Sequence, residues 1–156
     1  MRLALFCFAC LLSSLSNAAE SKVYLLATVT IGGSNLSNSI FLYEPEIKDL
    51  QGCQQAVSAG QQQNDWLRYH HIFQRDKIKG FTAQTSYRCV NSDLDIETWY
   101  DRDRYDLAYL FNVDANSTLQ VTLMDNLSDC HTRLGSVVDV PQALTFCAKG
   151  SQRIAR

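Results

Sequence analysis

The segment NLSDCHTRL, residues 126–134, combines a cysteine with apolar residues at helical spacing. A second segment with the same pattern, DLQGCQQAV, occupies residues 49–57. The residues at offsets i, i+3 and i+7 are Leu127, Cys130 and Leu134 in one segment and Leu50, Cys53 and Val57 in the other. Because residues with these offsets lie on one face of an α-helix, we predict two helices that each turn a cysteine towards a hydrophobic core.

A strand with a cysteine is predicted after each helix. In FTAQTSYRCV, residues 81–90, apolar residues alternate with polar ones, and Cys89 lies on the apolar face. The segment ALTFCAKG, residues 143–150, is shorter and carries Cys147. An alternation with a period of two is typical of a β-strand that buries one face. Each half of the chain therefore places a helix with a cysteine before a strand with a cysteine.

Strand candidates also precede both helices. The longer ones are KVYLLATVTI at 22–31 and DLAYLFNV at 106–113, and the shorter ones are SIFLY at 39–43 and TLQVTLM at 118–124. For the helix starts we predict Pro45 at an early helical position, where a missing N–H is harmless, and Asp125 as an N-cap. The chain is thus predicted to be βαβ twice, or ββαβ twice if the shorter segments form strands.

These units predict an α+β fold in a single domain, residues 19–156, with unit one at about 22–91 and unit two at about 105–150. The most economical arrangement is one antiparallel sheet with both helices on one face, either ferredoxin-like or a tandem (β)βαβ pseudo-repeat. In this arrangement the helix cysteine of each unit meets the cysteine of the next strand. Among the three pairings open to four cysteines, we therefore predict the disulfides Cys53–Cys89 and Cys130–Cys147.

The face of the sheet opposite the helices is predicted to expose apolar side chains. If Cys147 faces a helix, Leu144 and Phe146 face the other way, because successive side chains of a strand alternate. We expect a dimer partner, a loop or a ligand to cover these two residues. A homodimer is therefore one of the predicted assemblies.

The first eighteen residues predict a secretory signal peptide. Arg2 is followed by the apolar run LALFCFACLL at 3–12 and then by small and polar residues, and this run is too short for a membrane span of about 20 residues. Cleavage would remove Cys7 and Cys10, and the other four cysteines would form two disulfides in an oxidising compartment. We expect an exported protein, periplasmic or extracellular, that is not inserted in the membrane after cleavage.

Composition and motifs exclude several classes of function. With 14 Lys and Arg against 16 Asp and Glu, a net charge of −2 and no long basic tract, we predict no nucleic-acid partner. Asp93, Asp95 and Glu97 have the spacing that starts a calcium loop, but Thr98 replaces its glycine and Arg104 its glutamate. The chain also has no G-x-S-x-G, H-E-x-x-H or phosphate-binding glycine loop. We therefore predict no metal site and no cofactor, and we prefer a non-catalytic role to an enzymatic one.

Two segments have no counterpart in the other half, the insertion 64–79 and the linker 91–106. We expect function in them because scaffolds carry specialised residues on connecting segments. The candidate binding residues are Trp66, Arg68, Tyr69, His70, His71, Arg75 and Lys77 in the insertion, with Trp99 and Tyr100 in the linker. The alternatives are that the insertion is a short helix packing aromatic residues on the core, and that the linker is a solvated acidic connection.

The resulting hypothesis is a small exported, disulfide-stabilised domain that binds an unknown protein or small ligand through the insertion and the linker. The alternative is a small exported hydrolase. Its acid and base would come from His70, His71 and the acidic residues of the linker. A polar constellation shared by the two halves would favour an enzyme, and the sequence contains none, so binding is the preferred hypothesis.

Overall fold

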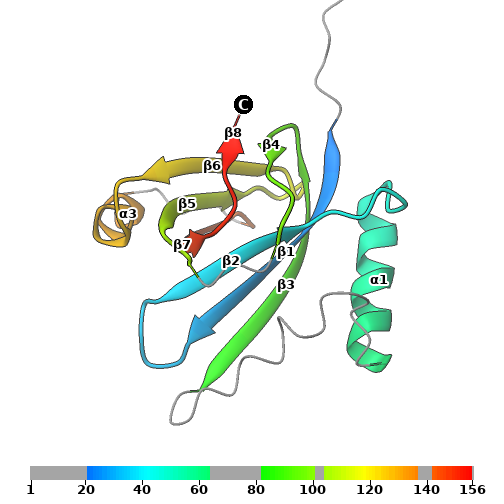
Figure 1. Cartoon of the computed structure of the whole chain (residues 1–156), viewed down its shortest axis with the longest axis horizontal. Coiled ribbons are helices and arrows are strands. Elements are labelled where there is room, and N and C mark those ends of the chain that lie inside the picture. Colours follow the sequence, from blue (N-terminus) through cyan, green and yellow to red (C-terminus); the bar gives the residue numbers. More distant parts are fainter. Residues whose placement is uncertain (1–20, 64–81, 101–103, 137–141, 156) are drawn as a thin grey trace, which may run out of the picture.

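A curved six-stranded sheet, two helices and a separate two-stranded ribbon form the part of the chain that the computed structural model describes (Figure 1). The described residues are 21–63, 82–100, 104–136 and 142–155. The elements are β1 (Lys22–Ile31), β2 (Ser37–Leu42), α1 (Leu50–Gln63), β3 (Ala83–Ser92), β4 (Asp95–Ile96), β5 (Leu107–Val113), β6 (Leu119–Met124), α3 (Leu127–Leu134), β7 (Leu144–Gly150) and β8 (Ile154–Ala155). The predicted signal peptide 1–18 and the insertion 64–79 lie outside the described residues.

All six strands of the large sheet occur where the sequence predicts strands. β1 has the predicted bounds, and the ends of the other five strands differ from the predicted ends by at most two residues. The shorter β-prone segments are strands, so each half has the order ββαβ. The ribbon of β4 and β8 was not predicted, because two residues are too few to show an alternation.

The strand order of the sheet is β3-β1-β2-β7-β5-β6, and its central pair, β2 and β7, is parallel. All the other neighbouring strands are antiparallel. The prediction of a purely antiparallel sheet is therefore wrong, and a ferredoxin-like arrangement is not confirmed. Alternation within a strand specifies which side chains share a face, but it says nothing about the direction of the neighbouring strand.

The sheet curls so that its two edge strands meet at one end. The N–H of Asn91 in β3 donates a hydrogen bond of 2.8 Å to the carbonyl of Ser117, just before β6. The concave face encloses the largest core cluster, formed by Tyr24, Leu26, Phe41, Val90, Ile96, Tyr109, Phe111, Val113, Leu119 and Ala148. At its centre, the buried ring of Phe111 lies 5.7 Å from the ring of Phe41 and 5.1 Å from that of Phe146.

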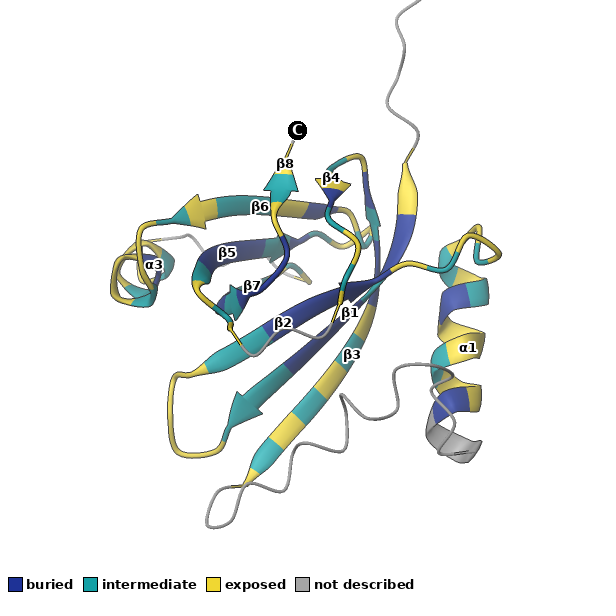
Figure 2. Cartoon of the chain, viewed as in Figure 1, coloured by how far each residue is buried: buried dark blue, intermediate teal, exposed yellow. Residues whose placement is uncertain are grey.

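The two helices pack on the convex face, and a disulfide ties each of them to the sheet. Cys53 bonds to Cys89 and Cys130 bonds to Cys147, which confirms the predicted pairing. The strand residues that contact the helices alternate with those of the concave core, so both helices lie on one face, as predicted. Figure 2 shows the buried stripe of α1 among its exposed residues.

The starts of both helices differ from the prediction. The side chain of Asn126, not Asp125, caps α3 by accepting a hydrogen bond of 3.0 Å from the N–H of Asp129. Pro45 precedes α1 and lies outside it, and Asp49 accepts a hydrogen bond of 2.7 Å from the N–H of Gly52. Side-chain oxygens at these positions satisfy N–H groups that a helix leaves without an internal partner.

Candidate functional site

Residues 94–99 of the linker 91–106 pack against the rest of the fold. Leu94 and Ile96 pack against the concave core, while Trp99 packs on the convex side of β1 and β2. The cluster that Trp99 joins contains Ala27, Ile40 and Leu42. Apolar side chains therefore anchor this stretch on both faces of the sheet, while the acidic residues Asp93 and Asp95 of the linker are exposed.

The C-terminal residues hold the linker in place. The side-chain amide of Gln152 donates a hydrogen bond of 2.7 Å to the carbonyl of Glu97. The main chain of Arg153 completes the junction, since its carbonyl accepts from the N–H of Glu97 at 2.9 Å and its N–H donates to Glu97 Oε2 at 3.0 Å. The pairing of β4 with β8 continues this junction. The backbone of the linker thus has a defined position beside β2.

Where the linker passes the ends of β1 and β2, it borders a cavity of about 220 Å³, which we name the linker pocket. Its lining residues are Lys22, Tyr24, Phe41, Leu42, Tyr43, Asp95, Ile96, Glu97, Thr98 and Trp99. The rings of Tyr24 and Tyr43 are 5.4 Å apart, and Lys22 Nζ lies 5.9 Å from the ring centre of Tyr43. Burial, followed by the negative charge of Asp95, raises the pKa of the Tyr24 phenol. The linker pocket therefore has aromatic walls and charged groups of both signs.

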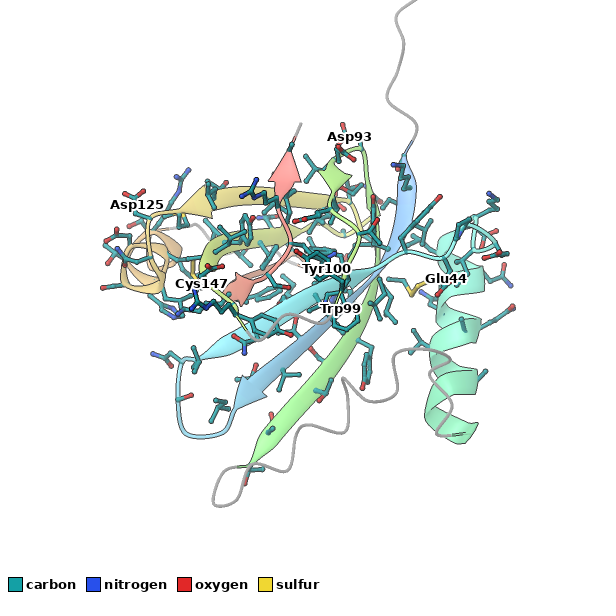
Figure 3. All side chains as sticks on the ribbon, in the orientation of Figure 1. Glu44, Asp93, Trp99, Tyr100, Asp125 and Cys147 are labelled. Atoms are coloured by element: carbon teal, nitrogen blue, oxygen red, sulfur yellow. A yellow bond between two sulfur atoms is a disulfide. The ribbon has the colours of Figure 1, made fainter. Side chains whose placement is uncertain are left out.

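The predicted binding residues divide into two groups. Trp99 and Tyr100 are described: Trp99 is half-buried and Tyr100 is 54% exposed. Figure 3 shows both near the middle of the molecule, well away from Asp93 and Asp125. The others, all in the insertion, lie outside the described residues; they are Trp66, Arg68, Tyr69, His70, His71, Arg75 and Lys77.

The acidic residues of the linker that the hydrolase hypothesis invokes occupy different environments. Asp93 and Asp95 are exposed, whereas the carboxylate of Glu97 accepts the hydrogen bond from Arg153. Within the described ranges, no three His, Cys, Asp or Glu side chains are grouped closely enough to hold a metal ion. The histidines that would complete an acid and base pair, His70 and His71, lie outside the described part.

A second cavity, of about 180 Å³, was not predicted and lies on the concave face. We name it the inner groove; its lining residues are Leu26, Thr28, Thr30, Ser37, Ser86, Arg88, Leu144 and Phe146. Leu144 is 38% exposed there, while Phe146 packs partly into the core. The predicted position of Leu144 and Phe146 on this face was the sequence signal for the groove, whereas its Ser and Thr residues resemble those of an ordinary solvent-exposed strand face.

No family model, no curated protein and no solved structure matches the chain. None of the helices in the described part is both long enough and apolar enough to span a membrane. The two disulfides are consistent with an exported protein.

Proposed function

We propose that this protein is an exported, non-catalytic domain, periplasmic or extracellular, that binds a protein or small ligand through the linker 91–106 and the insertion 64–79. Two disulfides support export, because such bonds persist in oxidising compartments. The absence of catalytic motifs from the sequence favours binding over hydrolysis. The site of binding is inferred from the linker pocket.

The observation that carries this proposal is the anchoring of the linker beside an aromatic cavity. Gln152 and Arg153 hold the main chain of Glu97, so Thr98 and Trp99 have defined positions at the edge of the pocket. A binding site whose backbone is already ordered loses less entropy when a ligand binds. Long connections without such anchoring are usually poor at presenting a single binding geometry.

The walls of the linker pocket favour contacts with a planar or apolar group. Aromatic side chains contribute much of the binding energy at recognition sites, and Tyr43 is 40% exposed at this one. Lys22 and Asp95 are exposed at its rim and offer one charge of each sign. A partner with an apolar centre and polar periphery is the expected complement.

We also propose that the two halves are copies of one ββαβ unit. Their topologies support this, because in each half the last strand pairs with the first and the helix is disulfide-bonded to the last strand. In this interpretation the insertion and the linker are additions to a duplicated scaffold. Specialised function is expected in such additions rather than in the shared elements.

The two tryptophans of the chain, Trp66 and Trp99, provide a direct test because each lies in one proposed binding segment. Protein containing fluorinated tryptophan should give two fluorine NMR signals, which the variants Trp66→Phe and Trp99→Phe assign. Fractions of small molecules and proteins from the compartment of the protein are then added. A shift or broadening of either signal is the expected result, and a bound ligand that leaves both signals unchanged would refute the proposal.

The charge of the insertion is tested separately. A variant with Arg68, Arg75, Lys77 and Lys79 all replaced by Ser should lose partner capture, while its stability changes by no more than about 0.5 kcal/mol. The control is Trp66→Ala, which should cost about 3 to 5 kcal/mol only if the insertion packs on the core. Unchanged capture by the charge variant, together with a strongly destabilised Trp66 variant, would remove the insertion from the proposed site.

A further inference from the structure

The inner groove has an ordered series of polar and apolar positions on its floor. Cross-strand pairing places Arg88 of β3 beside Leu26 of β1, and Ser86 beside Thr28. The next position of β1 is Thr30, whose hydroxyl lies 2.8 Å from the hydroxyl of Ser37 on β2. On the floor of the groove, the charged Arg88 and the apolar Leu26 are therefore neighbours, and residues with hydroxyl groups come next along both strands.

The opposite wall of the groove is apolar and comes from β7. Leu144 and Phe146 both line it, and Phe146 is held by its contact with Phe111 at 5.1 Å between ring centres. Leu144 keeps an exposed fraction of 38%. The groove therefore offers an apolar surface on one side and hydrogen-bonding groups on the other.

Arg88 is the charged residue of the groove, and no lining residue is acidic. Its guanidinium makes no hydrogen bond or ion pair with any residue in the described ranges. The hydroxyls add donors, because in a pair such as Thr30 and Ser37 one hydroxyl donates and the other keeps its own proton. These groups are complementary to a negatively charged, hydrogen-bond-accepting ligand.

The volume of the groove suits a compact molecule. An engineered protein cavity of about 150 Å³ binds benzene, so 180 Å³ has room for one ring or a short alkyl chain. The planar fork of an arginine matches the two oxygens of a carboxylate. The size, charge and shape of the groove therefore all point to a small carboxylate with a compact apolar part.

We propose that the inner groove binds a small carboxylate with a compact apolar body, the carboxylate on Arg88 and the apolar part against Leu144 and Phe146. This site shares no lining residue with the linker pocket. The test of this site is therefore independent of the test of the proposed function. Ser86 lies two positions from Arg88 on the same face of β3, so its hydroxyl is the candidate second contact for the carboxylate.

The test uses phenylpropionate as the probe and phenylpropanol as its neutral counterpart. Titration of isotopically labelled protein, followed by NMR, should shift the amide signals of Arg88, Leu144 and Phe146. Affinity measured by calorimetry should fall about tenfold to a hundredfold in Arg88→Gln, because a charged hydrogen bond is lost. It should fall about tenfold in Leu144→Ser, where apolar contact is lost. The neutral alcohol should bind at least tenfold more weakly than the acid.

Arg133→Gln is the matched control, since Arg133 is exposed on α3 and lies outside the groove. It should bind the probe as the unchanged protein does. Three results would overturn the proposal: no binding at millimolar concentration, equal binding of acid and alcohol, or shifts confined to residues around Trp99. A dimer in sedimentation experiments that Leu144→Ser converts to a monomer would also overturn it, because a second copy would then cover the groove.

Discussion

The side-chain amide of Gln152 binds the main chain of Phe41 as a neighbouring strand would. Its Oε1 accepts a hydrogen bond from the N–H of Phe41 at 2.6 Å, and its Nε2 donates to the carbonyl of Phe41 at 2.9 Å. The pairing of β2 with β7 consists of one residue pair, Asn38 with Lys149, so further along β2 another group must satisfy this edge. Gln152 does so and also binds the linker.

Replacing Gln152 by Ala should destabilise the protein by about 3 kcal/mol. Gln152 and Phe41 are both buried, so the substitution removes the partner of the N–H and the carbonyl of Phe41, and it also removes the bond to the carbonyl of Glu97. A buried group left without a partner costs about 1 to 3 kcal/mol. Urea unfolding measures the loss. Arg153→Ala is the control, because Arg153 contacts the linker through its main chain and its side chain is exposed. Equal effects of the two substitutions would contradict the role given to the Gln152 amide.

Gly150→Ala should cost about 1 to 3 kcal/mol, as overpacking of a core does. A Cβ at this position would lie 3.2 and 3.3 Å from two ring carbons of Tyr109, which is buried and cannot move away freely. Gly135→Ala is the matched control. Its Cβ would lie 3.6 Å from the nearest atom and its φ of −63° is ordinary for alanine, so stability should stay the same or rise slightly. Thermal and urea unfolding of both variants test the contrast.

Asn126→Ala should destabilise the protein by about 1 kcal/mol, the usual effect of losing an N-cap. The Asn126 side chain accepts from the N–H of Asp129 and donates to its carboxylate at 2.7 Å. Asp125→Ala should change stability by less than about 0.5 kcal/mol, because Asp125 is exposed and does not cap the helix. The reverse order of the two effects in unfolding experiments would favour the original prediction of Asp125 as the cap.

Each disulfide should contribute according to the loop it closes. Cys53–Cys89 spans 36 residues and Cys130–Cys147 spans 17, so the chain-entropy estimate is about 4 and 3 kcal/mol, respectively. Replacing both cysteines of one pair by Ala, followed by urea unfolding, should show the larger loss for the first pair. Peptide mapping of the unreduced protein should recover both pairs, and a fragment that joins Cys53 to Cys130 would contradict the fold.

The strands and disulfides were predictable because their signals are local. A period of two places Cys89 and Cys147 on defined faces, and the helical stripe places Cys53 and Cys130 opposite them, so the pairing follows. The junction at Gln152 was not predictable, because it depends on contacts between residues 111 positions apart in the chain. Side chains that bind distant main-chain groups have no periodic signal.

The two named cavities were also only partly predictable from the sequence. Trp99 was selected for its position in an unmatched segment, and it does line the linker pocket. Thr28, Thr30 and Ser37 look like polar residues on the solvent side of ordinary strands, yet they lie on the concave face with the core. In the folded sheet these residues lie together with Leu144 and Phe146 of β7 around one groove, a long-range arrangement that no local pattern specifies.

The buried phenol of Tyr109 donates a hydrogen bond of 3.0 Å to the carbonyl of Gln152 and links stability to alkaline pH. Burial, with a smaller contribution from the charge of Glu97, raises the pKa of this phenol above its ordinary value of about 10. The folded protein therefore holds the proton more tightly than the unfolded chain does. This contribution to stability is complete below about pH 10 and is lost as the pH rises through the pKa of the folded state.

Tyr109→Phe should consequently be less stable than the unchanged protein near neutral pH, by about 1 kcal/mol for the lost hydrogen bond. Above about pH 10 its unfolding free energy should fall less steeply with pH, because the substituted ring does not ionise. The pKa of the Tyr24 phenol is also raised, chiefly by burial, so Tyr24→Phe should flatten the remaining slope. Urea unfolding at a series of alkaline pH values measures these slopes. If Tyr109→Phe and the unchanged protein lose stability in parallel, the phenol of Tyr109 is not one of the groups that couple alkaline pH to unfolding.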